Sequence, residues 1–111
     1  MKPKQTVLAL AALAHDHRLA IYRLLVQAGP EGKPAGEIAD SLKLPPSSLS
    51  FHLAHLNRAG LIAQRRASRS LIYSADFEQM DALVGFLTEN CCGGRSCEPA
   101  SKSNLAKRKR A

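Results

Sequence analysis

The sequence predicts a mostly α-helical domain with one small β-hairpin, and three features lead to this fold class. Leu49, Leu53 and Leu56 recur at steps of four and three residues, which places them on one stripe of a helix. A double-proline turn separates this helix from a shorter one before it. After Gly60, two short β-prone runs follow each other closely. Two helices around a tight turn, followed by a hairpin, are typical of a winged helix-turn-helix.

Length and charge limit what the domain can be. The chain has 111 residues, 45% of them hydrophobic, which predicts one domain that can bury a core and still gain from pairing with a second copy. The formal net charge is +7, but five basic residues and no acid lie in residues 102–111, which leaves +2 for residues 1–101. Affinity for a polyanion such as DNA must therefore come from where the basic side chains lie.

The first half of the chain predicts three helices. Residues 5–14 are rich in Ala and Leu and free of Gly and Pro, so they favour a first helix. Asp16 is suited to cap a second helix from His17 to about Ala28, which is apolar over most of its circumference. Pro34 is expected to open a short third helix, because proline is favoured in the first turn.

The fourth helix carries short or compact polar side chains opposite its leucine stripe. The residues expected to face outward are Ser47, Ser48, Ser50, His52, His55 and Arg58. Together they offer hydrogen-bond donors and acceptors, the chemistry that recognises base edges in a major groove. An ordinary surface helix can show the same pattern, so the flanking segments decide the interpretation.

The hairpin supplies that flanking evidence. Its strands are predicted at residues 61–66 and 70–74, and its tip region holds Arg65, Arg66 and Arg69. A guanidinium group is planar and weakly hydrated, which suits it to phosphates or a narrow minor groove. An arginine-bearing hairpin next to a polar helix favours the wing of a DNA-binding domain over an ordinary charged turn.

The last predicted helix begins after Asp76 and has an apolar stripe. This stripe either covers the core or, with the apolar first helix, forms a two-fold interface, and we favour the interface. The residues expected between the two chains of such a homodimer are Leu8, Phe77, Met80, Val84 and Leu87.

These segments resemble the ArsR-type metalloregulatory repressors, bacterial winged-helix dimers, from about Val7 to Leu87. The most specific parts of the resemblance are Ser48-x-Ser50-x-His52-Leu53-x-x-Leu56-x-x-Ala59-Gly60-Leu61-Ile62, Ala39-x-x-Leu42 and Arg18-Leu19-x-Ile21-x-x-Leu24-Leu25. The resemblance implies that the serines and the histidine of the first segment face an inverted-repeat operator DNA. It also implies that the arginine-bearing hairpin contacts the flanking groove and that the first and last helices pair the two chains.

Two departures from the family pattern affect the inducer. His15-Asp16-His17 stands where the family often has Asp-Pro-Thr, and residues 34–38 lack the Cys-x-Cys pair of the best-known arsenic site. Some relatives instead carry a three-cysteine arsenite site after the last helix, and Cys91, Cys92 and Cys97 resemble that arrangement.

The thiol chemistry of this segment fits the same inducer. Thiolates select soft ions, and trivalent arsenic or antimony takes three ligands in a pyramid. We therefore predict As(III) or Sb(III) at Cys91, Cys92 and Cys97. Zinc would need a fourth ligand, from His15, His17 or a partner chain, and stays open as an alternative. A thiol redox sensor stays open too, whereas the sequence lacks the Cys-x-x-Cys or spaced Cys and His pattern of an enzyme.

The expected organisation has three parts. Residues 1–90 form the winged-helix and dimerisation domain, residues 91–97 the cysteine-rich inducer segment, and residues 98–111 a disordered basic tail, whose role stays open and for which a non-specific DNA-gripping arm is one alternative. The odd number of cysteines predicts a reducing cytoplasm, because one chain cannot pair all three in disulfides. The apolar run Val7–Ala14 imitates a signal peptide, but its helical period continues beyond Ala14, and no run is long enough to cross a membrane.

Overall fold

The structure is a computed structural model that describes residues 1–94. Predictions on Cys97 and on the basic tail lie outside the described residues. The elements are α1 (Pro3–Leu13), α2 (Asp16–Ala28), β1 (Lys33–Pro34), α3 (Ala35–Leu42), α4 (Pro46–Arg58), β2 (Ile62–Ala67), β3 (Ser70–Ala75), α5 (Phe77–Leu87) and a 3₁₀ turn, η1 (Cys91–Gly94). The predicted helices and the predicted hairpin are all present, so the winged helix-turn-helix fold class is confirmed.

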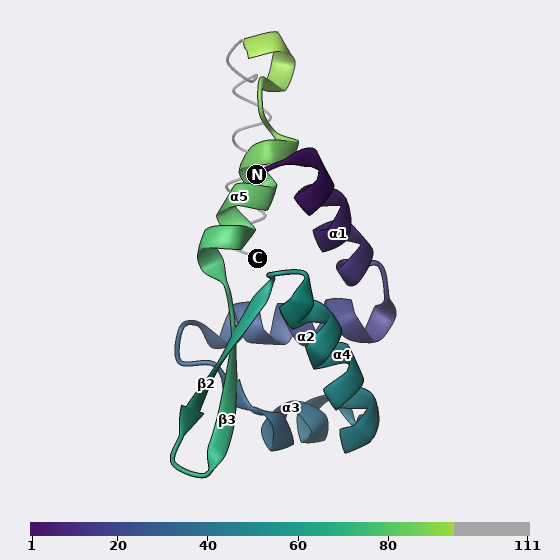
Figure 1. Cartoon of the computed structure of the whole chain (residues 1–111), viewed down its shortest axis with the longest axis vertical. Coiled ribbons are helices and arrows are strands. Elements are labelled where there is room, and N and C mark those ends of the chain that lie inside the picture. Colours follow the sequence, from purple (N-terminus) through teal and green to yellow (C-terminus); the bar gives the residue numbers. More distant parts are fainter. Residues whose placement is uncertain (95–111) are drawn as a thin grey trace.

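The elements are arranged in two parts that share one core (Figure 1). α1 and α5 lie side by side at one end, while α2, α3, α4 and the hairpin form the other end. The centre is closed by fully buried side chains from α2, α3, α4 and the segment before β2: Ile21, Leu25, Ile38, Leu56 and Leu61. The leucine stripe of α4 therefore packs inward, as its spacing predicts.

Two helix starts test the capping predictions. Asp76 caps α5 as predicted, because its side chain accepts a hydrogen bond from the backbone N–H of Gln79 at 3.1 Å. The prediction that Asp16 caps α2 is wrong: His15 is the cap, and its Nδ1 accepts from the N–H of His17 at 3.1 Å. Asp16 is instead the first helical residue, where its carboxylate still suits the positive end of the helix dipole.

The sheet has one strand more than the sequence predicts. β2 and β3 pair antiparallel from Ile62 opposite Ala75 to Ala67 opposite Ser70, and β1 adds to the other edge of β3. Pro34 therefore ends a short strand and precedes α3. The prediction that Pro34 is the first residue of the third helix is wrong. A strand of two residues is too short to show the alternation by which strands are recognised in a sequence.

Candidate nucleic-acid interface

The outward face of α4 carries a short polar patch with one aromatic side chain. Ser47 and Ser50 are exposed and Ser48 is half-buried. Phe51 lies among them with 64% of its surface exposed, and the sequence analysis missed it. Helical geometry could have found it, because a residue two positions after Leu49 lies about 200° around the helix axis. A phenyl ring on this face can contact a thymine methyl group, while the serines hydrogen-bond base edges.

The prediction that His52 faces outward is wrong. Its side chain is only 8% exposed, and its ring lies 4.7 Å from the ring of His15 and 5.6 Å from that of His17, between centroids. The position explains this, because residue 52 follows Leu49 by three and so borders the inward stripe. Burial, with the neighbouring His15 and His17, lowers the pKa of His52 below its ordinary value, so the ring is neutral at neutral pH.

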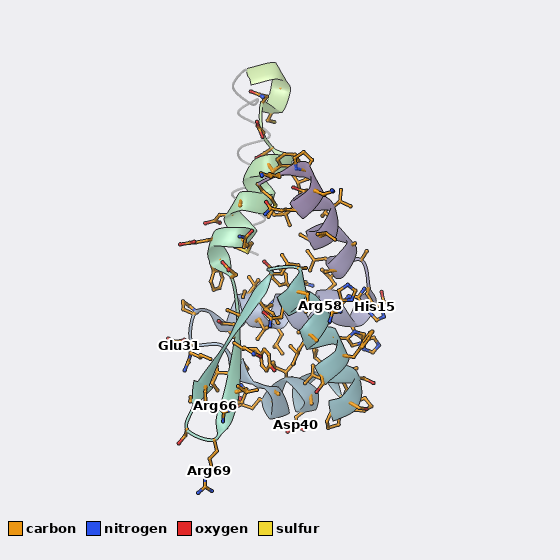
Figure 2. The ribbon with its side chains drawn as sticks, viewed as in Figure 1. His15, Glu31, Asp40, Arg58, Arg66 and Arg69 are labelled. Atoms are coloured by element: carbon orange, nitrogen blue, oxygen red, sulfur yellow. The ribbon has the colours of Figure 1, made fainter. Side chains whose placement is uncertain are left out.

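His55 and Arg58 lie at the other end of α4 from the double-proline turn. His55 is half-buried and Arg58 is exposed, and both line a groove with Leu8 of α1. Partial burial lowers the pKa of His55, and the charges of Arg18 and Arg58 act in the same direction. In Figure 2, Arg58 lies near α1 and far from Arg69 at the hairpin tip. Arg58 therefore lies apart from the serine patch and from the tip of the hairpin.

The hairpin does not present its three arginines together. The guanidinium of Arg65 donates a hydrogen bond from Nη2 to the backbone carbonyl of Glu31 at 3.0 Å, so it faces the loop between α2 and β1. Arg66, the next residue along β2, has its side chain on the opposite face of the strand. Arg69 sits in the two-residue turn and extends beyond the hairpin tip (Figure 2). Arg66 and Arg69 are thus exposed, while Arg65 also joins the hairpin to the body of the domain.

One hollow connects the hairpin with both helices of the helix-turn-helix. It is lined by Ser50 of α4, Gly36 in the first turn of α3, and Arg69 and Ser70 of the hairpin. A cation, two hydroxyls and the N-terminal end of a helix all favour an anion. A duplex that fits its major groove onto Ser50 would bring a phosphate close to this hollow.

The predicted interface residues divide into two groups. Phe77 and Met80 are half-buried against the core of their own chain. Leu8, Val84 and Leu87 are 60, 54 and 58% exposed on the adjacent helices α1 and α5. An exposed apolar surface of this kind is typical of a protein contact. The structure describes one chain, so the role of these residues in a dimer stays a prediction.

The two described cysteines lie just beyond α5. Cys91 and Cys92 are exposed in η1, with 3.7 Å between their Sγ atoms. His15 lies at the corner between α1 and α2, away from η1 (Figure 2). Within one chain, therefore, the structure does not bring His15 to the cysteines to complete a zinc site.

Comparison with known proteins identifies the class of this domain. A helix-turn-helix domain family model matches residues 13–65. The helix-turn-helix-type transcriptional regulator YgaV of Escherichia coli K12 is 33% identical over 89 residues, which span 80% of this chain and 88% of YgaV. The chain belongs to the helix-turn-helix transcriptional regulators. YgaV and a second relative, HlyU of Vibrio cholerae, are named as regulators of transcription and not as enzymes, as the sequence predicts.

Solved structures of this regulator family share the whole fold. HlyU of Vibrio cholerae, named a transcriptional activator, has a TM-score of 0.65 and 30% identity, with 83% of this chain and 99% of HlyU covered. A structure of reduced HlyU gives a TM-score of 0.64, with 30% identity over 80% of this chain and 90% of that one. A homodimeric winged helix-turn-helix DNA-binding domain from Mycobacterium bovis, described as a possible ArsR-family regulator, has a TM-score of 0.62 at 24% identity and covers 86% of this chain and 88% of its own. The regulator described here thus has the ArsR-like winged-helix fold.

Among residues 1–94 of the regulator, no helix is both long and apolar enough to cross a membrane.

Proposed function

We propose that this regulator is a homodimeric repressor of an inverted-repeat operator, released by As(III) or Sb(III) bound to Cys91, Cys92 and Cys97. The observation that carries the inducer is the pair of adjacent thiols, 3.7 Å apart and exposed at the end of α5. The observation that carries DNA binding is the polar patch on α4 beside the arginine-bearing hairpin. A second chain is expected on the exposed apolar surface of α1 and α5.

In this proposal, α4 recognises the base sequence and the hairpin contacts the phosphates. Ser47, Ser50 and Phe51 lie on the face of α4 that enters the major groove and recognises sequence. Arg66 and Arg69 contact phosphates, which position the protein without regard to sequence. The modest net charge of residues 1–101 fits this arrangement, because a few well-placed cations replace a general basic excess.

Replacing Arg69 with Ala should weaken binding to operator and to unrelated duplex by a similar factor. Loss of one phosphate contact should also make the slope of log affinity against log salt shallower by about one. The measurement is fluorescence anisotropy of labelled DNA at several salt concentrations. Arg65→Ala is the matched control, because that guanidinium already donates to Glu31. If Arg65→Ala changed the salt slope as much as Arg69→Ala, the assignment of Arg69 to a phosphate would be rejected.

The thiols react with arsenite by simple condensation. Arsenous acid, As(OH)₃, exchanges its three hydroxyl groups for the sulfurs of three thiols, and the thiol protons leave with these hydroxyls as three water molecules, so no oxidant or reductant is needed. Two thiols alone leave one hydroxyl on arsenic and release two water molecules. The proximity of Cys91 and Cys92 favours binding of the second sulfur once the first has reacted.

Induction requires arsenic to bind the free repressor more tightly than the DNA-bound form, with a typical coupling of about 1–3 kcal/mol. α5 offers the physical link, because it carries Val84 and Leu87 on the proposed interface and leads directly to Cys91. A metalloid that fixes the end of α5 would alter how the two chains pair. The spacing of the two α4 helices, which has to match the operator half-sites, would change with it.

Changing Cys91 or Cys92 to Ser should abolish release of operator DNA by arsenite while leaving operator binding intact. A hydroxyl neither ionises near neutral pH nor suits a soft ion, and neither residue lies on α4 or the hairpin. The measurement is anisotropy of operator DNA during an arsenite titration. Glu89→Gln, an exposed change beside the thiols, is the control and should respond like the unchanged protein. Full release from both serine variants would contradict the proposal.

A thiol redox sensor is the second candidate, favoured by the 3.7 Å approach of the two sulfurs and by the relative HlyU, whose structure is described for a reduced form. Hydrogen peroxide would take two electrons and two protons from Cys91 and Cys92, giving a disulfide and two water molecules. Peroxide-driven release of operator DNA, reversed by dithiothreitol and absent with arsenite, would select this candidate.

A further inference from the structure

One phenyl ring stands out on the face of α4 that is proposed to meet DNA. The chain has three phenylalanines and two tyrosines, all of them among residues 1–94. Four of these side chains are buried or half-buried, whereas Phe51 is 64% exposed. Single exposed apolar residues are common on protein surfaces, so exposure alone assigns no role to Phe51. A role follows from where the ring lies and from what it can bind.

Phe51 belongs to a small apolar patch on the outward face of α4. Ser47 precedes it by four positions and Ala54 follows it by three, so both are its neighbours on the helix surface. Both are exposed, and so is Ser50. Phe51 and Ala54 offer apolar surface without a side-chain donor or acceptor, whereas the serines offer hydroxyl groups. The face therefore combines an apolar part with a polar part.

The ring of Phe51 is held against the rest of the domain through His52. The two rings are 5.6 Å apart between centroids and meet edge to face, at 69° between their planes. Aromatic pairs prefer this geometry. His52 is only 8% exposed, and its own ring lies close to those of His15 and His17. Because its neighbour is packed in place, the phenyl ring loses less conformational freedom when it binds a partner.

The chemistry of the major groove limits what a phenyl ring can recognise there. Base pairs present hydrogen-bond donors and acceptors in this groove, and a phenyl ring cannot pair with them. The exception is the methyl group of thymine, which is the apolar group that a base pair shows in the groove. Contact between this methyl group and a phenyl ring removes apolar surface of both from water. An exposed phenyl ring on a recognition helix therefore favours thymine.

We propose that Phe51 is a specificity-determining residue that contacts the methyl group of one thymine in each half-site of the operator. This contact presupposes the proposed binding of operator DNA by α4 and adds the identity of one base. Ser47 and Ser50, on either side of the ring, hydrogen-bond neighbouring base edges. Methylated cytosine carries its methyl group at the same ring position as thymine, so it should replace thymine in this contact, whereas uracil should not.

The test starts from a duplex that the full chain selects out of a library with randomised positions. Each thymidine of that duplex is replaced in turn by deoxyuridine, which removes the methyl group and leaves the hydrogen-bonding groups of the base unchanged. One replacement in each half-site should weaken binding about fourfold, the factor expected for one buried methyl group. Where cytosine stands at that position instead, its methylation should strengthen binding by a similar factor. The measurement is fluorescence anisotropy at one fixed salt concentration.

Phe51→Ala should bind the thymidine and deoxyuridine duplexes equally well. The side chain is exposed, so the variant should fold, and circular dichroism checks this. Ser50→Ala is the matched control, because Ser50 is exposed on the same helix one residue earlier. This control should bind DNA more weakly but keep the preference for the methyl group.

The proposal is overturned if no deoxyuridine replacement weakens binding by the unchanged protein. It is also overturned if Phe51→Ala keeps the preference for the methyl group or if Ser50→Ala loses it. In these cases the selected duplex is still bound, so the proposed operator binding stands. A full chain that selects no sequence from the library would reject operator binding itself, and the contact of Phe51 with it.

Discussion

Val84→Asp should convert the proposed homodimer into monomers. Val84 is 54% exposed on α5 beside Leu87, on the apolar surface where a second chain is expected. Full burial of a valine side chain contributes about 1.5–3 kcal/mol, so burial of the exposed half contributes roughly half of that, and two-fold symmetry counts it twice. The dissociation constant of the dimer should therefore rise at least roughly tenfold, and the unpaired carboxylates should raise it further. Sedimentation equilibrium measures the effect directly.

Phe51→Asp is the matched control for this experiment. Phe51 is 64% exposed on α4, so the change puts the same charge in place of an apolar side chain that is at least as exposed as Val84. Phe51→Asp should remain dimeric and lose operator binding, because its carboxylate would face the DNA. A folded Val84→Asp protein that stayed dimeric would move the interface away from this part of α5.

The sequence was sufficient to predict the structure wherever a periodic pattern was long. The stripe of Leu49, Leu53 and Leu56 packs into the core as predicted, and Asp76 caps the last helix. These features depend on local geometry, because helical spacing and capping each involve residues within one or two turns. The order of helices and hairpin followed from them, and so did the class of fold.

Such local patterns did not predict contacts between segments that are far apart in the sequence. The partner of Arg65 is the carbonyl of Glu31, 34 residues earlier, and no spacing in the sequence relates the two. The ring of His52 is buried because α4 lies against a corner formed by His15 and His17. A histidine at the edge of an apolar stripe can face either way, and only the packing of a second segment decides. The same uncertainty hid Phe51, an apolar residue on a face expected to be polar.

The candidate site therefore lies on α4 and the hairpin, as predicted, but some of its residues differ from those predicted. Ser47 and Ser50 remain on the outward face, Phe51 joins them, and His52 leaves. Arg69 stays at the tip of the hairpin. β3 also comes close to the backbone of the segment before β1, at Gly32.

Gly32→Ala should lower the free energy of unfolding by roughly 3 kcal/mol or more. Gly32 has φ +69°, a left-handed conformation that costs other residues about 1–2 kcal/mol. An added Cβ would also overlap the backbone carbonyl of Tyr73, which belongs to β3, one of the two strands of the hairpin. Backbone cannot move aside as a flexible side chain can, so β1 and β3 would have to separate. Urea unfolding followed by circular dichroism gives the change.

Substitutions at two other glycines distinguish the conformational cost at Gly32 from the cost of the overlap with Tyr73. Gly60 has φ +79° with no atom within 4 Å of an added Cβ, so Gly60→Ala should show the conformational cost alone, about 1–2 kcal/mol. Gly36 lies in α3 with open space around it, and Gly36→Ala should stabilise the fold by up to about 1 kcal/mol, because alanine favours a helix. Gly32→Ala should exceed Gly60→Ala by the cost of the overlap with Tyr73. Equal losses at the two positions would show that the approach of β3 to Gly32 does not hold the hairpin in place.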